Sequence, residues 1–188
     1  MENELHEILP PALLMITIAF LLHIIGNATT YYITIEYPDL IINSGLWKRC
    51  ESNANDKVCY NEKLYAEYDW YRVCLAMSAF GFIALLASIA CIGLRLSKFP
   101  ENKVLRITAI LVTFSAVVFI LIGTVLFVKN VDDITTGGEF VYGYSFALCI
   151  AGMCLAALVD ILLVIGLIMP KKNTRNCVDA NSINNINF

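Results

Sequence analysis

Two polar side chains lie inside long apolar stretches of the chain, and these are the residues that could do chemistry there. His23 is one of two histidines, and Asp160 is the only acid of the last apolar stretch. A histidine and a carboxylate at one depth in a membrane could relay a proton or an ion, or they could form a buried hydrogen-bonded pair. At about 1.5 Å of helix per residue, the two lie at similar depths. We predict a structural intramembrane polar pair of His23 and Asp160.

The chain lacks the residue sets that are typical of enzymes. It contains no Gly-x-Ser-x-Gly, P-loop or His-Glu-x-x-His motif. We therefore predict that the protein is not an enzyme and that it has no catalytic residues, cofactor or metal site. With 13 basic and 16 acidic residues and a net charge of −3, it also has no basic surface for a nucleic-acid partner.

The cysteines divide between apolar and polar segments. Of the seven, only Cys50 and Cys59 lie in a long polar loop. An oxidising compartment favours a disulfide there, and closing a loop of about ten residues stabilises it by about 2.5–3 kcal/mol. Two free thiols or a metal pair are the alternatives, but no histidine or further cysteine lies nearby to complete a metal site. Cys177, beside Lys171 and Lys172, is a candidate palmitoylation site, with a free thiol as the alternative.

The composition excludes a water-soluble globule and a disordered chain. Hydrophobic residues make up 59% and charged residues 15% of the chain, and the mean hydropathy is +0.70. The apolar residues form blocks that are long enough to cross a bilayer core of about 30 Å. We predict an all-α membrane fold, a four-helix transmembrane bundle in a single tetraspan domain over residues 1–188, with membrane lipids around it. The expected helices cover about 11–30, 73–95, 105–128 and 141–169.

The basic residues predict which ends of the helices face the cytoplasm. Seven of them flank the helices closely on one side, whereas six are spread over longer loops on the other side together with ten acids. Both termini, including a tail over 170–188, are therefore expected inside. A cleaved signal peptide is the alternative for the first block, but residues 1–10 carry three acids and no Lys or Arg. The seven flanking residues are Arg95, Lys98, Lys103, Arg106, Lys171, Lys172 and Arg175.

The two outer loops then cover 33–72 and 129–140, and the first has its own structural signals. Residues 30–37 are rich in β-branched and aromatic types and stop at Pro38-Asp39, which predicts a strand. Asn43-Ser44-Gly45 is typical of a turn. Residues 62–70 favour a short helix. We expect a small disulfide-linked extracellular β-sheet on the bundle.

Gly45-Leu46-Trp47, followed by Cys50 and Cys59, resembles the signature in the first outer loop of the claudin superfamily. That superfamily includes claudins, peripheral myelin and epithelial membrane proteins, and calcium-channel gamma subunits. Arg72 stands where the family carries an arginine at the mouth of the second helix. Claudins proper carry a further tryptophan just after the first helix, where this chain has Tyr31 or Tyr32. The chain is thus similar to a divergent claudin-like member.

The resemblance implies a structural membrane protein at cell–cell contacts in the plasma membrane, in the manner of a tight junction. Such a protein forms or regulates a paracellular barrier or adhesion through its first outer loop, with itself or claudin-like proteins as partners in cis and in trans. The alternatives are an auxiliary, gamma-type subunit of an ion channel or receptor and a tetraspan adaptor. A PDZ protein could also bind the C-terminal residues Ile186 to Phe188.

The signature residues also have a physical interpretation. Gly45 would permit a tight turn with positive φ. Leu46 and Trp47 would dip into the membrane interface, which aromatic rings prefer, and Trp47 would be a buried anchor of the loop. On that reading the motif stabilises the loop and has no binding role of its own.

Overall fold

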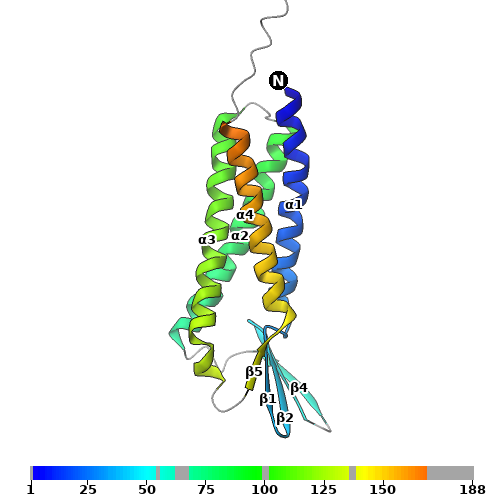
Figure 1. The fold of residues 1–188 in the computed structure, drawn as a ribbon, viewed down its shortest axis with the longest axis vertical. Helices are drawn as coiled ribbons and strands as arrows, with labels where there is room; N and C mark the ends of the chain where they lie inside the picture. Colours follow the sequence, from blue (N-terminus) through cyan, green and yellow to red (C-terminus); the bar gives the residue numbers. More distant parts are fainter. Residues whose placement is uncertain (1, 54–55, 62–67, 99–101, 136–138, 169–188) are drawn as a thin grey trace, which may run out of the picture.

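The computed structural model describes residues 2–53, 56–61, 68–98, 102–135 and 139–168. Its helices are α1 (Glu2–Ala28), α2 (Asp69–Ser97), α3 (Lys103–Asn130) and α4 (Tyr144–Ile168). All four are long and apolar enough to cross a membrane. The expected four-helix membrane bundle is therefore confirmed, and Figure 1 shows it with a sheet at the end opposite the N-terminus.

The first helix starts earlier than the sequence indicates, because it runs through Pro10 and Pro11 back to Glu2. Each proline lacks an amide donor, so two carbonyls one turn earlier lose their helical partner. That loss is tolerable at a helix end, where water can bind the carbonyls outside the hydrocarbon core. At its other end α1 stops at Ala28, and the chain turns directly into the sheet.

Small residues allow the helices to approach closely inside the bundle. A Cβ on Gly81 of α2 would lie 2.7 Å from Ile120 of α3, and a Cβ on Gly152 of α4 would lie 2.9 Å from the Ala19 carbonyl of α1. Such positions favour tight helix packing in lipid, where the hydrophobic effect between helices is weak. These glycines therefore serve contacts within the bundle.

The sheet is antiparallel, with five strands in the order β4-β3-β2-β1-β5. The first loop supplies β1 (Ile33–Tyr37), β2 (Leu40–Ser44), β3 (Lys48–Ser52) and β4 (Lys57–Asn61). The second loop supplies β5 (Glu139–Tyr142), which pairs with β1 from Ile33↔Tyr142 to Glu36↔Glu139. This pairing, which the sequence reading missed, joins both outer loops into one layer. The short 3₁₀ helix η2 (Val131–Ile134) leads from α3 towards it.

The expected small sheet is thus confirmed, but its turn lies later than predicted. Asn43 and Ser44 are strand residues, and the reversal occurs over Gly45–Trp47, where the Gly45 amide donates to the Lys48 carbonyl at 2.8 Å. Most of the helix expected over 62–70 lies outside the described residues, as do Cys177 and Ile186 to Phe188.

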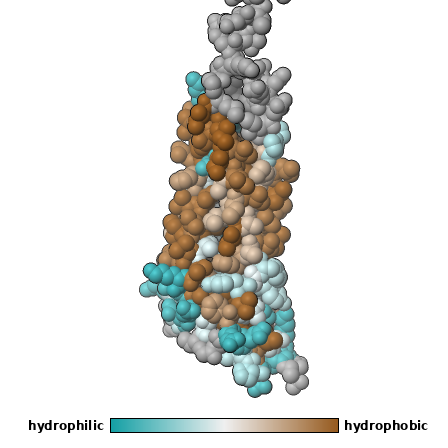
Figure 2. All heavy atoms as spheres, in the orientation of Figure 1, coloured by the Kyte–Doolittle hydropathy of each residue, from teal (hydrophilic) through white to brown (hydrophobic). Residues whose placement is uncertain are grey.

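The surface matches a membrane protein with one polar end. Figure 2 shows hydrophobic residues along the length of the helices and hydrophilic residues gathered around the sheet. Beneath the sheet, its buried residues Ile33, Ile35, Ile42 and Leu46 pack with Tyr71, Phe127 and Val131 from the helix ends. The sheet therefore shares one core with the ends of α2 and α3.

Candidate functional site

The signature turn between β2 and β3 is held between the end of α1 and the start of α2. Tyr71, which is 1% exposed, donates its hydroxyl to the carbonyls of Leu46 at 2.9 Å and Gly45 at 3.3 Å. On the other side, Gly45 lies against the backbone of Thr29 and Thr30. The turn is thereby fixed to two helices at once.

Gly45 is required for a different reason than the one predicted. A Cβ at this position would lie 2.3 Å from the Thr29 carbonyl oxygen and 2.9 Å from the Thr30 Cα, whereas the Gly45 backbone lies outside the left-handed region. The prediction of a positive φ is therefore wrong. Glycine is needed because the strand turn passes in contact with the end of α1, where no side chain fits.

Leu46 and Trp47 have opposite environments. Leu46 is 3% exposed and belongs to the shared core, but Trp47 is 47% exposed. The prediction of a buried Trp47 anchor is wrong, because Leu46 takes the buried position of the turn. Trp47 lies at the surface, next to α1 and α2. There it lines an apolar groove of about 470 Å³ together with residues of α1 and α2. The apolar residues of that groove are Ile24, Ala28, Ala79, Phe82 and Ile83.

Arg72 does not hold the turn. It is exposed, and within the part of the chain that the structure describes its side chain makes no hydrogen bond or ion pair. The preceding residue, Tyr71, supplies the contact instead, because it faces the sheet from the first turn of α2. Nothing in the sequence around Arg72 indicates that the tyrosine before it is buried and contacts the turn.

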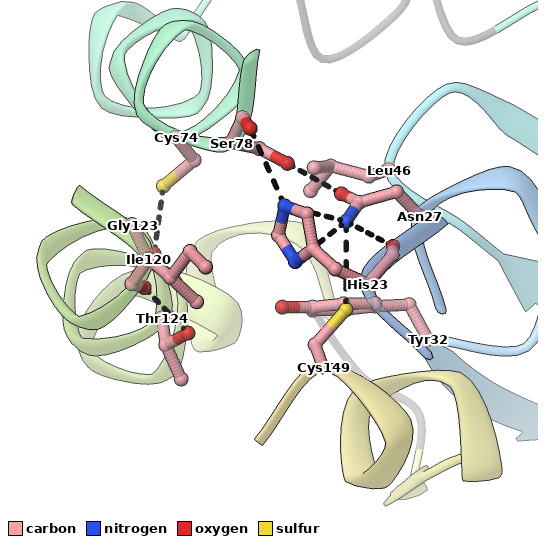
Figure 3. A pocket seen from close by; sticks show the side chains of 10 residues that line it. All are labelled: His23, Asn27, Tyr32, Leu46, Cys74, Ser78, Ile120, Gly123, Thr124 and Cys149. Carbon is pink, nitrogen blue, oxygen red and sulfur yellow. Dashed lines mark hydrogen bonds between the residues drawn. The ribbon is translucent and has the colours of Figure 1, made fainter. Parts of the chain in front are cut away.

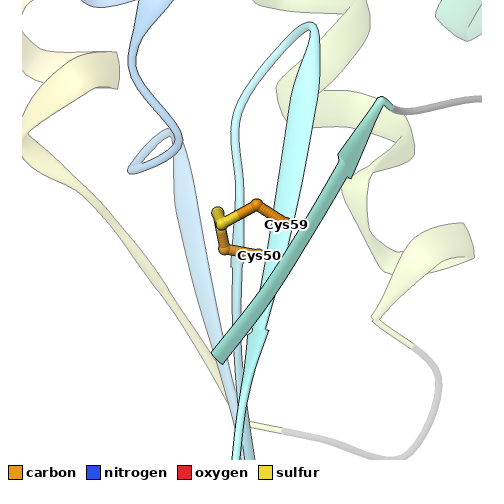
Figure 4. The surroundings of a disulfide bond; sticks show 2 residues. All are labelled: Cys50 and Cys59. Atoms are coloured by element: carbon orange, nitrogen blue, oxygen red, sulfur yellow. A yellow bond between two sulfur atoms is a disulfide. The ribbon is translucent and has the colours of Figure 1, made fainter. Parts of the chain in front are cut away.

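Cys50 and Cys59 form the predicted disulfide, which connects two neighbouring strands (Figure 4). The two cysteines are directly opposite each other in the β3–β4 register. All five residues of β4 are exposed, so little core packing holds this edge strand. The disulfide and the Tyr60 hydroxyl, which donates to Glu51 of β3, therefore secure β4 to the sheet.

A polar network crosses the bundle below the sheet, and its contacts converge on Asn27 and His23 of α1 (Figure 3). Asn27, one turn along α1, donates to the His23 carbonyl at 2.7 Å and contacts the imidazole at 3.3 Å. Its side-chain oxygen accepts a hydrogen bond from Ser78 of α2 at 2.5 Å, and its amide also reaches Cys149 of α4 at 3.6 Å. The network thus joins α1, α2 and α4.

The predicted His23–Asp160 pair does not form. The ring of His23 meets the Ser78 carbonyl at 3.4 Å, while Oδ1 of Asp160 is buried without a hydrogen-bond partner. Gly152 of α4 packs against the backbone of His23, and Asp160 lies eight residues, or about 12 Å, further along that helix. The prediction is wrong because it measured depth from assumed helix ends, whereas α1 begins nine residues earlier and ends at Ala28.

The network surrounds a cavity of about 20 Å³, which matches one water molecule. Figure 3 shows His23, Asn27, Ser78 and the ring of Tyr32 directed towards it. Burial raises the pKa of Tyr32, so its phenol stays protonated and can donate a hydrogen bond. The arrangement suits structural hydrogen bonding. Among the described residues, no group of three histidine, cysteine or acidic side chains is placed to hold a metal ion.

The chain matches a family model described as the PMP-22/EMP/MP20/Claudin family over residues 7–163. The match runs from within α1 into α4, so it includes both outer loops and every strand. The chain belongs to this family. No curated protein matches the chain.

The structure distinguishes the two tyrosines that follow the first helix. The structure places Tyr32 in the core, 5% exposed, with its ring edge-on to Phe127 at 4.8 Å and to Phe146 at 5.3 Å. Tyr31 instead stacks on Tyr144 at 5.2 Å. In this claudin-like tetraspan protein Tyr32 therefore provides the large buried ring just after the first helix, and its hydroxyl adds a polar contact with Thr124.

Proposed function

We propose that this protein acts at contacts between cells, where its sheet meets the sheet of a neighbouring cell and forms or regulates a paracellular barrier. The observation that carries the proposal is the docking of one disulfide-linked layer, built from both outer loops, onto the helix ends. A surface fixed in this way loses little conformational freedom on binding, which favours adhesion.

The proposal includes a topology with both termini in the cytoplasm of a plasma-membrane protein. It rests on the basic residues near the helix ends that lie away from the sheet. With that orientation the Cys50–Cys59 disulfide faces the oxidising side of the membrane, where such bonds persist.

The charges on the sheet favour a preference for cations. Glu36 and Glu139 are exposed and lie directly opposite each other on β1 and β5. Like charges in this position destabilise a strand pair, so two adjacent carboxylates are a cost to folding. They would raise the local concentration of cations along a path between cells.

The test is to express the protein in cells that lack such junctions and to measure its enrichment at contacts and the electrical resistance across the layer. We expect enrichment and altered resistance. The double variant E36Q/E139Q should reach contacts normally but show a lower preference for cations over anions. The control variant K103Q changes an exposed charge at the opposite end of α3 and should leave that preference unchanged.

A second function, as an auxiliary subunit of a channel in the same membrane, is favoured by the groove beneath Trp47. This groove is lined by Trp47 and by residues of the membrane-spanning helices α1 and α2, where a helix of a partner in the same membrane could pack. Uniform surface distribution with unchanged resistance, together with a change in a co-expressed channel's current that W47A abolishes, would support this function and contradict the junctional one.

A further inference from the structure

Two arginines face each other at the end of the bundle away from the sheet. Ser88 of α2 and Thr113 of α3 are 2.6 Å apart through their side-chain oxygens. Seven residues towards the α2–α3 connection on each helix, two turns further on the same faces, lie Arg95 and Arg106. The two arginines therefore lie on the facing sides of α2 and α3.

Both arginines are unusually buried for charged residues near the ends of helices. Arg95 is 3% exposed, and its Nε is buried without a hydrogen-bond partner. Arg106 is half-buried with the same unpartnered Nε, although its Nη2 donates to the Gly166 carbonyl of α4. Arginines near a membrane surface usually extend their charged groups into water, and Arg95 does not.

No acidic side chain neutralises this pair among the residues that the structure describes. The one ion pair there is Arg49–Glu51 in the sheet. Asp160, the nearest acid along α4, lies six residues, or about 9 Å, from Gly166. The first turn of α3 holds Lys103 and no acid, although the positive end of the helix dipole favours one. Among the described residues, the buried Arg95 at the end of α2 and the half-buried Arg106 near the start of α3 therefore lack an acidic partner.

We propose that Arg95 and Arg106 bind the phosphate group of an anionic lipid from the inner leaflet. The planar guanidinium binds phosphate oxygens through paired hydrogen bonds, which would satisfy both Nε donors. Basic sites between helices on the cytoplasmic side are where acidic headgroups bind. The assignment to the inner leaflet rests on the proposed topology and is independent of what the sheet does outside.

The test uses the full chain in phosphatidylcholine nanodiscs, with and without phosphatidylinositol bisphosphate, and measures Tm and the lipid retained in native mass spectra. We expect the anionic lipid to raise Tm by several degrees and to remain bound. R95Q and R106Q should lose the rise and the bound lipid. In plain phosphatidylcholine R95Q should be at least as stable as the natural chain, because it removes a buried charge that has no acidic partner among the described residues. R106Q also loses the hydrogen bond to the Gly166 carbonyl, so its stability there is not part of the test.

The control R72Q, an exposed arginine at the sheet end, should retain both responses. R95K should retain part of the Tm rise, because it keeps the charge and loses the paired donors.

An equal rise in the natural chain and in R95Q would overturn the proposal. Inorganic phosphate raising Tm as much as the lipid does would overturn the lipid assignment and leave a soluble-anion site.

Discussion

At the scale of single residues, Gly45 shows that a glycine can be required by a close backbone contact. The conformation of the turn itself would accept other residues. Its carbonyl accepts from Tyr71, its amide donates to Lys48, and its α-carbon faces the backbone at the end of α1. Each neighbour on that side is main chain rather than a flexible side chain. The site therefore has no way to admit even one methyl group without moving a strand or a helix end.

Gly45→Ala should therefore be strongly destabilising, by about 2 kcal/mol or more, as expected for overpacking against backbone. Gly93→Ala in α2 is the matched control, because a Cβ there meets nothing within 4 Å. That substitution should be neutral or stabilising by up to about 1 kcal/mol through helix propensity. Thermal unfolding in detergent compares the two, and equal Tm values would contradict the close-contact account of Gly45.

The polar residues inside the bundle give a second prediction at this scale. His23 and Asp160 make no contact, so a double-mutant cycle of H23L and D160N should give a coupling energy below about 0.5 kcal/mol. The cycle of N27A and S78A should give about 1 kcal/mol or more, because their side chains share a hydrogen bond. A large His23–Asp160 coupling would mean that the two helices are shifted against each other.

At the scale of elements, β4 depends on its covalent bond more than the other strands do. Its five residues are exposed, and it pairs only with β3 among the described strands. C50S/C59S should lower the free energy of unfolding of the sheet by about 2.5–3 kcal/mol, the value for a loop of this length. The bundle should keep its helical circular dichroism. Hydrogen exchange that speeds up in β3 and β4 but not in β1 would confirm the local role, and unchanged exchange in β4 would contradict it.

The elements differ in how well they could be predicted from sequence. The membrane helices could be predicted because each carries its own apolar block, and the disulfide could be predicted because Cys50 and Cys59 were isolated in one loop. β5 has only four residues, and its partner strand lies about a hundred residues away, so no local pattern identifies it. The His23 network was missed in part because a partner, Asn27, is an ordinary polar residue one turn further on.

At the scale of the whole molecule, the polar sheet at one end and the apolar helical bundle constrain the orientation of the chain in a bilayer. The sheet carries exposed charges, and all five residues of its edge strand β4 are exposed, so it must lie outside the hydrocarbon core. The arginines at the opposite end mark the other surface. Which of the two surfaces is cytoplasmic then decides both the partners of the sheet and the lipids that Arg95 can meet.

The last prediction is that the sheet is extracellular and both termini are cytoplasmic. An epitope inserted between β3 and β4 should be stained in intact cells, whereas one fused after Phe188 should be stained only after permeabilisation, because membrane-proximal basic residues are retained inside. The disulfide gives an independent readout: Cys50 and Cys59 should resist alkylation until reduced, since a cytoplasmic sheet would keep them as thiols. A cytoplasmic sheet would remove both the junctional role and the inner-leaflet site, so staining of the C-terminal epitope on intact cells would reject the two proposals together.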